Sequence, residues 1–302
     1  MAEQVKDLVI IGSGPAGWSA AIYGKRALLS LAVIEKDYMG TGQIAVTEQV
    51  DNYPGLPGIS GYDLGEKFRT HAEQLGTEFI EGEITKIGKS GRNWQVDFSD
   101  GRTETARAII YAAGASHRHL GVPGDDKQRI SYCAVCDGFF YKDKTVAVVG
   151  GGDTALGDAL YLSKLAKTVY LVHRRDEFRA NRSLQKRVSE AGNIVPVLGA
   201  VPKEVTGEGS ADGLIYVQNG EEKHLSVDGI FVAVGNVPNT APLEGLAELE
   251  NGYVRAGEDC VTSAPGLFAA GDVRTTPLRQ VITAAADGAN AVTSAEKYLN
   301  AE

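Results

Sequence analysis

The sequence is poor in cysteine, has no long apolar run and carries no excess of positive charge. Three cysteines in 302 residues are too few for the disulfide framework of a secreted protein. The run from Leu8 to Ile11 ends at Gly12, so it is too short for a signal-peptide core or a membrane span. With 39 acidic and 30 basic side chains, non-specific binding to nucleic acid or anionic membranes is disfavoured. We therefore expect a soluble, cytoplasmic protein that binds neither nucleic acid nor membranes.

What the sequence does have is an internal repeat of a nucleotide-binding pattern. Residues 8–36 read as apolar strand, glycine turn, small-residue helix and second apolar strand, and residues 146–175 repeat that order without a gap. An apolar strand ending in small residues follows each copy, at 108–114 and 229–235. The length also suits two domains.

The first glycine turn has the spacing Gly-x-Gly-x-x-Gly between a strand and a helix. Such a turn brings the backbone close to a pyrophosphate, which then faces the free N–H groups of the helix. Glu35 ends the second strand, where a carboxylate binds an adenosine ribose. The turn comprises Gly12, Ser13, Gly14, Pro15, Ala16 and Gly17.

The second turn runs from Gly150 to Ala155 and differs from the first at the end of its second strand. There His173 stands opposite Glu35 and is followed by Arg174 and Arg175. Arginine forks bind phosphate, whereas a carboxylate would repel a ribose 2′-phosphate, so this site is predicted to prefer NADP.

The neighbouring side chains keep two interpretations open. We assign Arg179 to the phosphate site, and we interpret Arg182 and Lys186 as a solvated helix face. His173 is either a cofactor contact or a packing residue.

A Cys-x-x-Cys pair, Cys133 and Cys136, lies between the two turns. A structural zinc site needs four ligands and no second such pair is present, so redox chemistry is favoured. Asp137 adjoins Cys136 and is either a proton-transfer group or a turn residue. Phe139 and Phe140 are either buried anchors or a patch for a partner protein. Cys260 has no partner motif and is interpreted as a buried structural thiol.

These patterns predict an α/β protein with two Rossmann-like nucleotide-binding domains of the three-layer ββα type, the second inserted into the first. The expected boundaries are 1–116 and 246–302 for the first domain and 117–245 for the second. The strand at 266–272 is assigned to the first domain.

The same motifs, in the same order over almost the whole chain, resemble the low-molecular-weight thioredoxin reductases. The resemblance also rests on Asn52-Tyr53-Pro54-Gly55, on Pro238-Asn239-Thr240 and on Arg279-Gln280. Thr41 departs from the pattern, in which a glycine pair is usual. The resemblance implies a homodimeric FAD enzyme that passes electrons from NADPH through FAD to the Cys133–Cys136 disulfide and then to thioredoxin. It also implies a rotation of the inserted domain about its two connections.

By the same resemblance, Cys136 faces the flavin, Cys133 attacks thioredoxin and Asp137 joins the catalytic set. The FAD site is predicted to comprise the first turn with Glu35, Lys36, Gly42, Gln43, Asn52, Ala113, Gly114, Gly271, Asp272, Arg279, Gln280 and Val281. The NADPH site is predicted to comprise Gly152, Asp153, Thr154, Ala155, His173, Arg174, Arg175, Arg179 and Gly235.

The alternatives are a flavin-dependent dithiol enzyme with a ferredoxin-type donor or a peroxiredoxin-linked partner, a dithiol oxidase, and a non-catalytic flavin-binding redox sensor. Arg174, Arg175 and Arg179 favour NADPH over the other donors.

Overall fold

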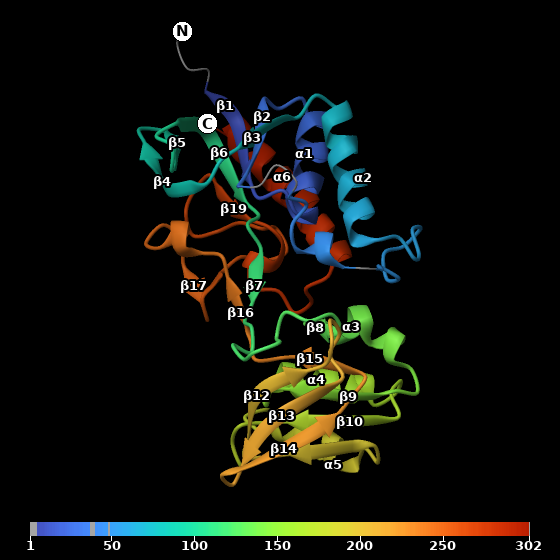
Figure 1. The fold of residues 1–302 in the computed structure, drawn as a ribbon. Helices are drawn as coiled ribbons and strands as arrows, with labels where there is room; N and C mark the ends of the chain where they lie inside the picture. The colour runs from blue at the N-terminus through green and yellow to red at the C-terminus, as the bar shows by residue number, and fades with distance from the viewer. Residues whose placement is uncertain (1–4, 37–39, 48, 302) are drawn as a thin grey trace. The chain divides into compact units, whose positions relative to one another are not determined.

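The computed structural model describes residues 5–36, 40–47 and 49–301, and the chain divides into two compact units (Figure 1). The first unit consists of Met1–Ser116 and Val237–Glu302, and the second of His117–Asn236. The sequence predicts a second domain of residues 117–245 with its return connection between Pro238 and Gly245, and in the structure the second unit ends at Asn236.

The first unit is built on a sheet with the order β3-β2-β1-β6-β5-β4, in which β19 also pairs with β6. β1, β2, β3, β6 and β19 pair in parallel, while β4 and β5 continue the sheet in antiparallel fashion. The strands are β1 (Lys6–Ile11), β2 (Leu31–Glu35), β3 (Glu78–Glu81), β4 (Ile84–Ser90), β5 (Asn93–Phe98), β6 (Thr103–Tyr111) and β19 (Leu267–Ala269).

Alternation along the parallel strands gives the first unit two buried faces. Leu8 and Ile10 point to the helices α1 (Pro15–Arg26), α2 (Gly61–Gln74) and α6 (Val281–Ala301). Val9 and Ile11 point to the opposite core, where they meet side chains of β4 and β5 and of the C-terminal segment. This is why β1 is apolar on both sides, as strands covered on both faces are.

The second unit repeats this plan with a parallel sheet in the order β11-β10-β9-β15-β8. The helices α4 (Asp153–Leu162) and α5 (Arg182–Glu190) pack on one face, and a separate antiparallel sheet packs on the other. The parallel strands are β8 (Ile130–Ser131), β9 (Thr145–Val149), β10 (Thr168–Val172), β11 (Ile194–Val197) and β15 (Gly229–Val232). The antiparallel strands are β12 (Ala200–Thr206), β13 (Gly213–Gln218) and β14 (Glu221–Ser226).

At the two crossings, β7 (Ala115–His117) pairs with β16 (Asn236–Pro238). The remaining elements are η1 (Gln43–Val46), α3 (Ala134–Asp137), η2 (Gly138–Tyr141), η3 (Ala241–Leu243), β17 (Leu249–Glu250), β18 (Tyr253–Val254) and η4 (Gly271–Val273). In the described part of the chain, every helix is too short or too polar to cross a bilayer. The predicted fold class, two Rossmann-like ββα units with the second inserted into the first, is confirmed.

Candidate active site and nucleotide sites

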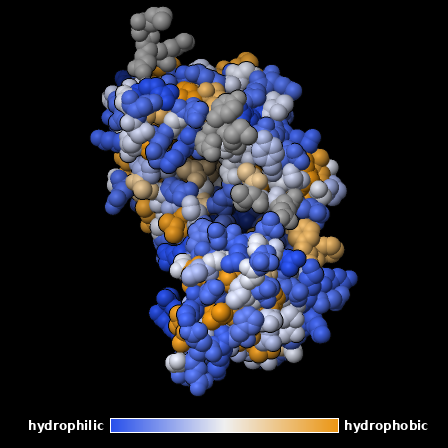
Figure 2. All heavy atoms as spheres, in the orientation of Figure 1, coloured by the Kyte–Doolittle hydropathy of each residue, from blue (hydrophilic) through white to orange (hydrophobic). Residues whose placement is uncertain are grey.

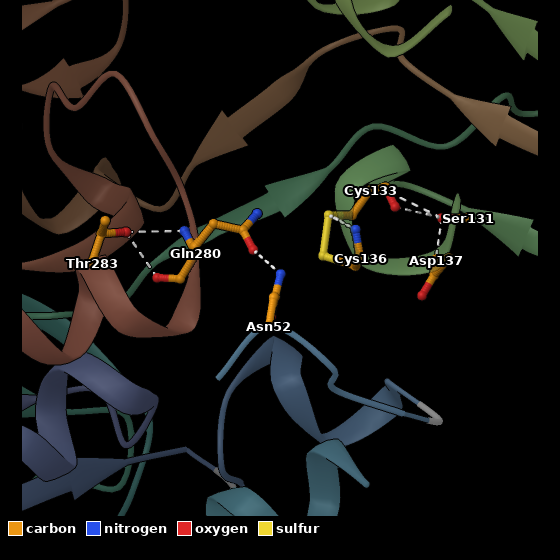
Figure 3. The surroundings of a disulfide bond; sticks show 7 residues. All are labelled: Asn52, Ser131, Cys133, Cys136, Asp137, Gln280 and Thr283. Atoms are coloured by element: carbon orange, nitrogen blue, oxygen red, sulfur yellow. Dashed lines mark hydrogen bonds between the residues drawn. A yellow bond between two sulfur atoms is a disulfide. The ribbon is translucent and has the colours of Figure 1, made fainter. Parts of the chain in front are cut away.

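Cys133 and Cys136 form a disulfide at the start of α3, in the second unit (Figure 3). Cys133 precedes the single turn of α3 and Cys136 lies within it, so the three-residue spacing brings the two Cα atoms to 5.3 Å. The backbone N–H of Cys136 donates a hydrogen bond to the Cys133 sulfur at 3.2 Å. The pair therefore lies on one tight turn and is able to cycle between disulfide and dithiol.

Ser131 links this turn to Asp137, and sequence reasoning did not single it out (Figure 3). Its hydroxyl donates to the Asp137 carboxylate at 2.6 Å and accepts from the Cys133 backbone N–H at 3.1 Å. Ser131 is buried at the end of β8, two residues before Cys133. The only signal in the sequence was a polar residue at a strand end before the dithiol. The carboxylate adjoining Cys136 is thus held by a buried hydroxyl group.

The two phenylalanines that follow the dithiol are solvent-accessible. Phe139 is 63% exposed, Phe140 37% and Val135 43%. In Figure 2, orange spheres gather over α3 and η2 among hydrophilic neighbours. The two phenylalanines are therefore exposed and are not buried anchors, while their contact with a partner protein remains a prediction. We call Val135, Phe139 and Phe140 the dithiol patch.

The first glycine turn, between β1 and α1, leaves room for a phosphate. Gly12 has a φ of +103°, and a Cβ there or at Gly17 would collide with the backbone. Gly14 caps α1 without a side-chain hydrogen bond, so the first N–H groups of the helix lack a local acceptor. Glu35 lies against this turn, because Ser13 donates to it through N and Oγ at 3.0 and 2.9 Å. Bare backbone and a nearby carboxylate fit the adenosine diphosphate half of FAD.

Two other predicted FAD residues of the first unit, Asn52 and Gln280, contact each other. The Asn52 amide donates to the Gln280 side-chain oxygen at 2.8 Å (Figure 3). Thr283, which the sequence analysis did not single out, accepts from the Gln280 N–H at 3.1 Å and fixes this residue at the start of α6. Val281 is the first residue of α6.

The loop that carries Gly271 and Asp272 is held by a buried ion pair that sequence reasoning also missed. The Asp287 carboxylate, on α6, accepts from Gly271 N at 2.9 Å and from the Arg274 guanidinium at 2.7 and 2.5 Å. Both side chains are almost completely buried. Arg279 lies 4.2 Å from the ring centre of Tyr253. Nothing in the small-residue pattern of α6 marked Asp287 as the group that orders this loop.

The other predicted FAD residues vary in how close they lie to the first turn. Ala113 and Gly114 follow β6, and the preceding residue, Ala112, lies directly against Gly12. Gly42 also approaches the turn, since a Cβ there would lie 2.9 Å from Gly14 Cα. Gln43 begins η1. The Lys36 ammonium instead pairs with Glu83 at 2.8 Å, on an exposed surface.

Thr41, the departure from the usual glycine pair, is fully buried. A Cβ at Gly65 of α2 would lie 2.5 Å from the Thr41 Cβ. The glycine at 65 therefore leaves the space that the threonine occupies, and among the described residues the Thr41 hydroxyl has no hydrogen-bond partner.

The second glycine turn, between β9 and α4, has the same features. A Cβ at Gly150 would collide with the Ala233 carbonyl, and Gly152 caps α4 without a side-chain hydrogen bond. Thr154 and Ala155 lie in the first turn of α4, and Gly235, with a φ of +115°, follows β15. A bare helix start again fits a pyrophosphate.

His173 packs over this turn. Its ring lies so close to Gly151 that any Cβ there would collide with it, and it stacks with Phe178 at 5.8 Å between centroids. Burial, followed by the positive charges of Arg175 and Arg174, holds the pKa of His173 below its usual value. The structure thus shows His173 packed against the turn and Phe178, and its contact with a cofactor remains a prediction.

The arginines that follow His173 are exposed, as a phosphate site requires. Arg174, Arg175 and Arg179 all lie on the loop between β10 and α5. Lys186 pairs with Glu190 one turn later on α5, at 3.8 Å and on an exposed surface, which agrees with its interpretation as a solvated face. Asp153 accepts hydrogen bonds from Asn181 at 2.7 and 3.2 Å.

Cys260 is fully buried in the first unit and donates to the Asp287 carbonyl at 3.4 Å. Burial raises the pKa of its thiol to about 12. The predicted burial of Cys260 is confirmed, and a thiol that ionises so reluctantly is a poor nucleophile, which supports a structural role.

Comparison with known proteins extends these observations. Residues 6–288 match the family described as pyridine nucleotide-disulphide oxidoreductase. Thioredoxin reductase of Bacillus subtilis is 40% identical over 98% of this chain and 96% of that protein. A protein of Pseudomonas fluorescens named glucosaminate ammonia-lyase is 42% identical over 97% of this chain and 95% of its own. The crystal structure of thioredoxin reductase from Streptococcus pyogenes superposes with a TM-score of 0.93 at 38% identity, covering both chains completely.

Proposed function

The chain belongs to the pyridine nucleotide-disulphide oxidoreductase family, and from that membership we propose that it is an NADPH-dependent thioredoxin-disulfide reductase with bound FAD. The observation that carries the proposal is the Cys133–Cys136 disulfide beside Asp137, in the same unit as an arginine-bearing nucleotide turn. A protein that only binds nucleotides would have no use for the disulfide.

In this proposal the first unit holds FAD through the Gly12–Gly17 turn, Glu35, Asp272 and the Asn52–Gln280 pair. FAD, when bound, supplies two-electron transfer between a nicotinamide and a disulfide. The second unit holds NADPH through the Gly150–Ala155 turn and binds the 2′-phosphate with Arg174, Arg175 and Arg179.

The dithiol then carries out an exchange in which electrons and atoms balance. Two electrons and two protons open the Cys133–Cys136 bond and give two thiols. The Cys133 thiolate attacks one thioredoxin sulfur, which forms a mixed disulfide and releases the other thioredoxin sulfur as a thiolate. Cys136 then attacks Cys133, so that the internal disulfide forms again and dithiol thioredoxin leaves. Asp137, beside Cys136, takes or returns the proton that each sulfur loses or gains.

We propose that thioredoxin docks on the dithiol patch. Exposed aromatic side chains next to a reactive site are the usual anchors of a protein interface. We further propose that the protein is cytoplasmic, since reduced thioredoxin is used in reducing compartments, and that it forms a homodimer, as its resemblance to the low-molecular-weight thioredoxin reductases implies.

The test is an assay of purified holoenzyme with separate donors and acceptors. We expect a yellow protein whose flavin absorbance is bleached by NADPH without oxygen, and whose turnover requires oxidised thioredoxin. A colourless protein that does not take up FAD, or a flavoprotein whose disulfide NADPH leaves unreduced, would contradict the proposal. Bleaching by reduced ferredoxin alone would instead favour the other donor class.

The relative named glucosaminate ammonia-lyase calls for a second assay. Ammonia release from glucosaminate is measured with wild-type protein and with the variant Cys133→Ser. We expect none from either protein. Release that persists in Cys133→Ser would indicate a function independent of the dithiol.

A further inference from the structure

The loop that bears the three arginines is attached to the second glycine turn at two points. The Arg179 N–H donates to the Gly151 carbonyl at 2.7 Å. Two residues later, Asn181 donates to one oxygen of the Asp153 carboxylate, from its backbone N–H at 2.7 Å and from its side-chain amide at 3.2 Å. All four residues of these contacts belong to the second unit, so the attachment of the loop involves that unit alone.

Asn181 is fixed from the other side as well. Its side-chain oxygen accepts from the Leu184 N–H at 2.9 Å and caps α5. The side-chain NH₂ of Asn181 therefore points toward Asp153, and its side-chain oxygen points toward the start of α5. Asp153 is the first residue of α4, where the helix dipole favours a negative charge. Through Asn181, the arginine loop is therefore attached to the start of a helix.

The three arginines follow His173 along this exposed loop, and the His173 ring lies against Gly151 of the turn. The Asp153 carboxylate accepts hydrogen bonds from Asn181, the last residue of the loop before α5. The sequence assigned Asp153 to direct cofactor binding, whereas its contacts suit the support of the loop.

We propose that Asp153 is a positioning residue that acts through Asn181 to hold Arg174, Arg175 and Arg179 where they bind the 2′-phosphate of NADPH. This inference rests on the proposed use of NADPH. Loss of the anchor releases the arginines but leaves the glycine turn in place. The affinity for the 2′-phosphate should therefore fall, while the affinity for the rest of the adenosine nucleotide should not.

The probes are 2′,5′-ADP, which carries the 2′-phosphate, and 5′-AMP, which lacks it. Dissociation constants are measured by calorimetry with holoenzyme. We expect Asp153→Ala to weaken 2′,5′-ADP about tenfold, as the loss of charge-assisted hydrogen bonds implies, and 5′-AMP by less than about twofold. The conservative Asp153→Asn keeps an oxygen acceptor and should stay within about twofold of wild type for both ligands.

A charge exchange provides a stricter test. Asn181→Asp keeps the oxygen that caps α5 but sets two carboxylates against each other, so it should weaken 2′,5′-ADP. The double variant D153N/N181D exchanges donor and acceptor and should recover the affinity. In turnover with thioredoxin, Asp153→Ala should raise KM for NADPH and leave kcat within about twofold of wild type.

The other possible results would contradict either the use of NADPH or the role of Asp153. Equal binding of both ligands by wild type would refute NADPH as donor and this inference with it. A wild-type preference that Asp153→Ala retains would refute the anchor alone. Equal weakening of both ligands by Asp153→Ala, or no recovery in the double variant, would show that Asp153 acts by direct contact or through stability.

Discussion

The two sulfur atoms of the dithiol have different hydrogen-bond surroundings. Cys133 Sγ accepts the N–H of Cys136, whereas the N–H of Cys133 donates to the Ser131 hydroxyl oxygen. An N–H donor stabilises a thiolate. At the scale of single residues, this asymmetry favours Cys133 as the attacking sulfur of the reduced pair.

The asymmetry predicts different behaviour for the two single cysteine variants. Cys136→Ser lacks the sulfur that resolves the mixed disulfide, so it should accumulate a covalent complex with oxidised thioredoxin. Cys133→Ser should not accumulate one. The measurement is a non-reducing gel with mass spectrometry, and Cys260→Ala serves as a control that should keep full turnover. A stable complex with Cys133→Ser would reverse the assignment.

Asp158 provides a prediction on pH. It lies on α4, and burial raises the pKa of its carboxyl to about 7. Because the folded protein binds this proton more tightly than the unfolded chain does, the contribution of Asp158 to stability is greatest below the unfolded pKa of 3.8 and is lost as the pH rises through about 7.

We therefore expect Asp158→Asn to be more stable than wild type at pH 8, by about 1–4 kcal/mol on the conversion of pKa units to free energy. The difference should shrink toward pH 5. Urea unfolding of both proteins at pH 5, 6.5 and 8 measures it. A constant difference across this range would mean that the carboxyl does not titrate there.

At the scale of elements, the parts of the protein that the sequence could predict are those encoded by adjacent residues. The glycine turns and the Cys-x-x-Cys turn each lie within a few residues, so spacing alone locates them. Asp287 and Ser131 could not be found, because their roles depend on partners that folding brings together, such as Gly271 for Asp287. The pairing of β16 with β7 could not be predicted either, because a pairing between distant segments leaves no local signal.

The η2 element gives a prediction about docking. Phe139 is 63% exposed and is therefore free to enter a pocket of the partner protein. Phe139→Ala should raise KM for thioredoxin about tenfold, as interface anchors do, while kcat stays within about twofold of wild type. Reduction of a small disulfide reporter should be unchanged, which controls for the chemistry. An equal loss with both substrates would argue against a docking role.

The η4 loop and α6 give a prediction about stability. Asp287→Ala leaves the buried Arg274 guanidinium without its carboxylate, which costs about 3–5 kcal/mol of unfolding free energy in comparable buried pairs. The same change frees Gly271 and should weaken FAD binding. Chemical unfolding of the protein freed of FAD and a flavin titration measure the two effects. Lys36→Ala, which breaks an exposed pair, should cost less than about 1 kcal/mol. Equal costs for the two variants would contradict the role assigned to Asp287.

At the scale of the whole molecule, the proposed function assigns the two cofactors to different units and the dithiol to the unit that binds NADPH. The nicotinamide and the disulfide must each reach FAD, and the dithiol must also reach a protein substrate. One arrangement of the units cannot serve every step. The proposed function therefore predicts a rotation of one unit on the other, and the paired strands β7 and β16 lie at the two crossings where it would occur.

The rotation can be tested with a short bismaleimide that joins one introduced cysteine on each unit. In the oxidised enzyme Cys133 and Cys136 are bonded to each other and Cys260 is buried, so the introduced pair reacts selectively. The locked enzyme should retain one half-reaction, either flavin bleaching by NADPH or exchange with thioredoxin, and lose overall turnover. The same variant treated with a monofunctional maleimide should turn over normally, because its units remain free to rotate. If the locked enzyme turns over at the rate of this control, a single arrangement serves every step and the rotation is not required.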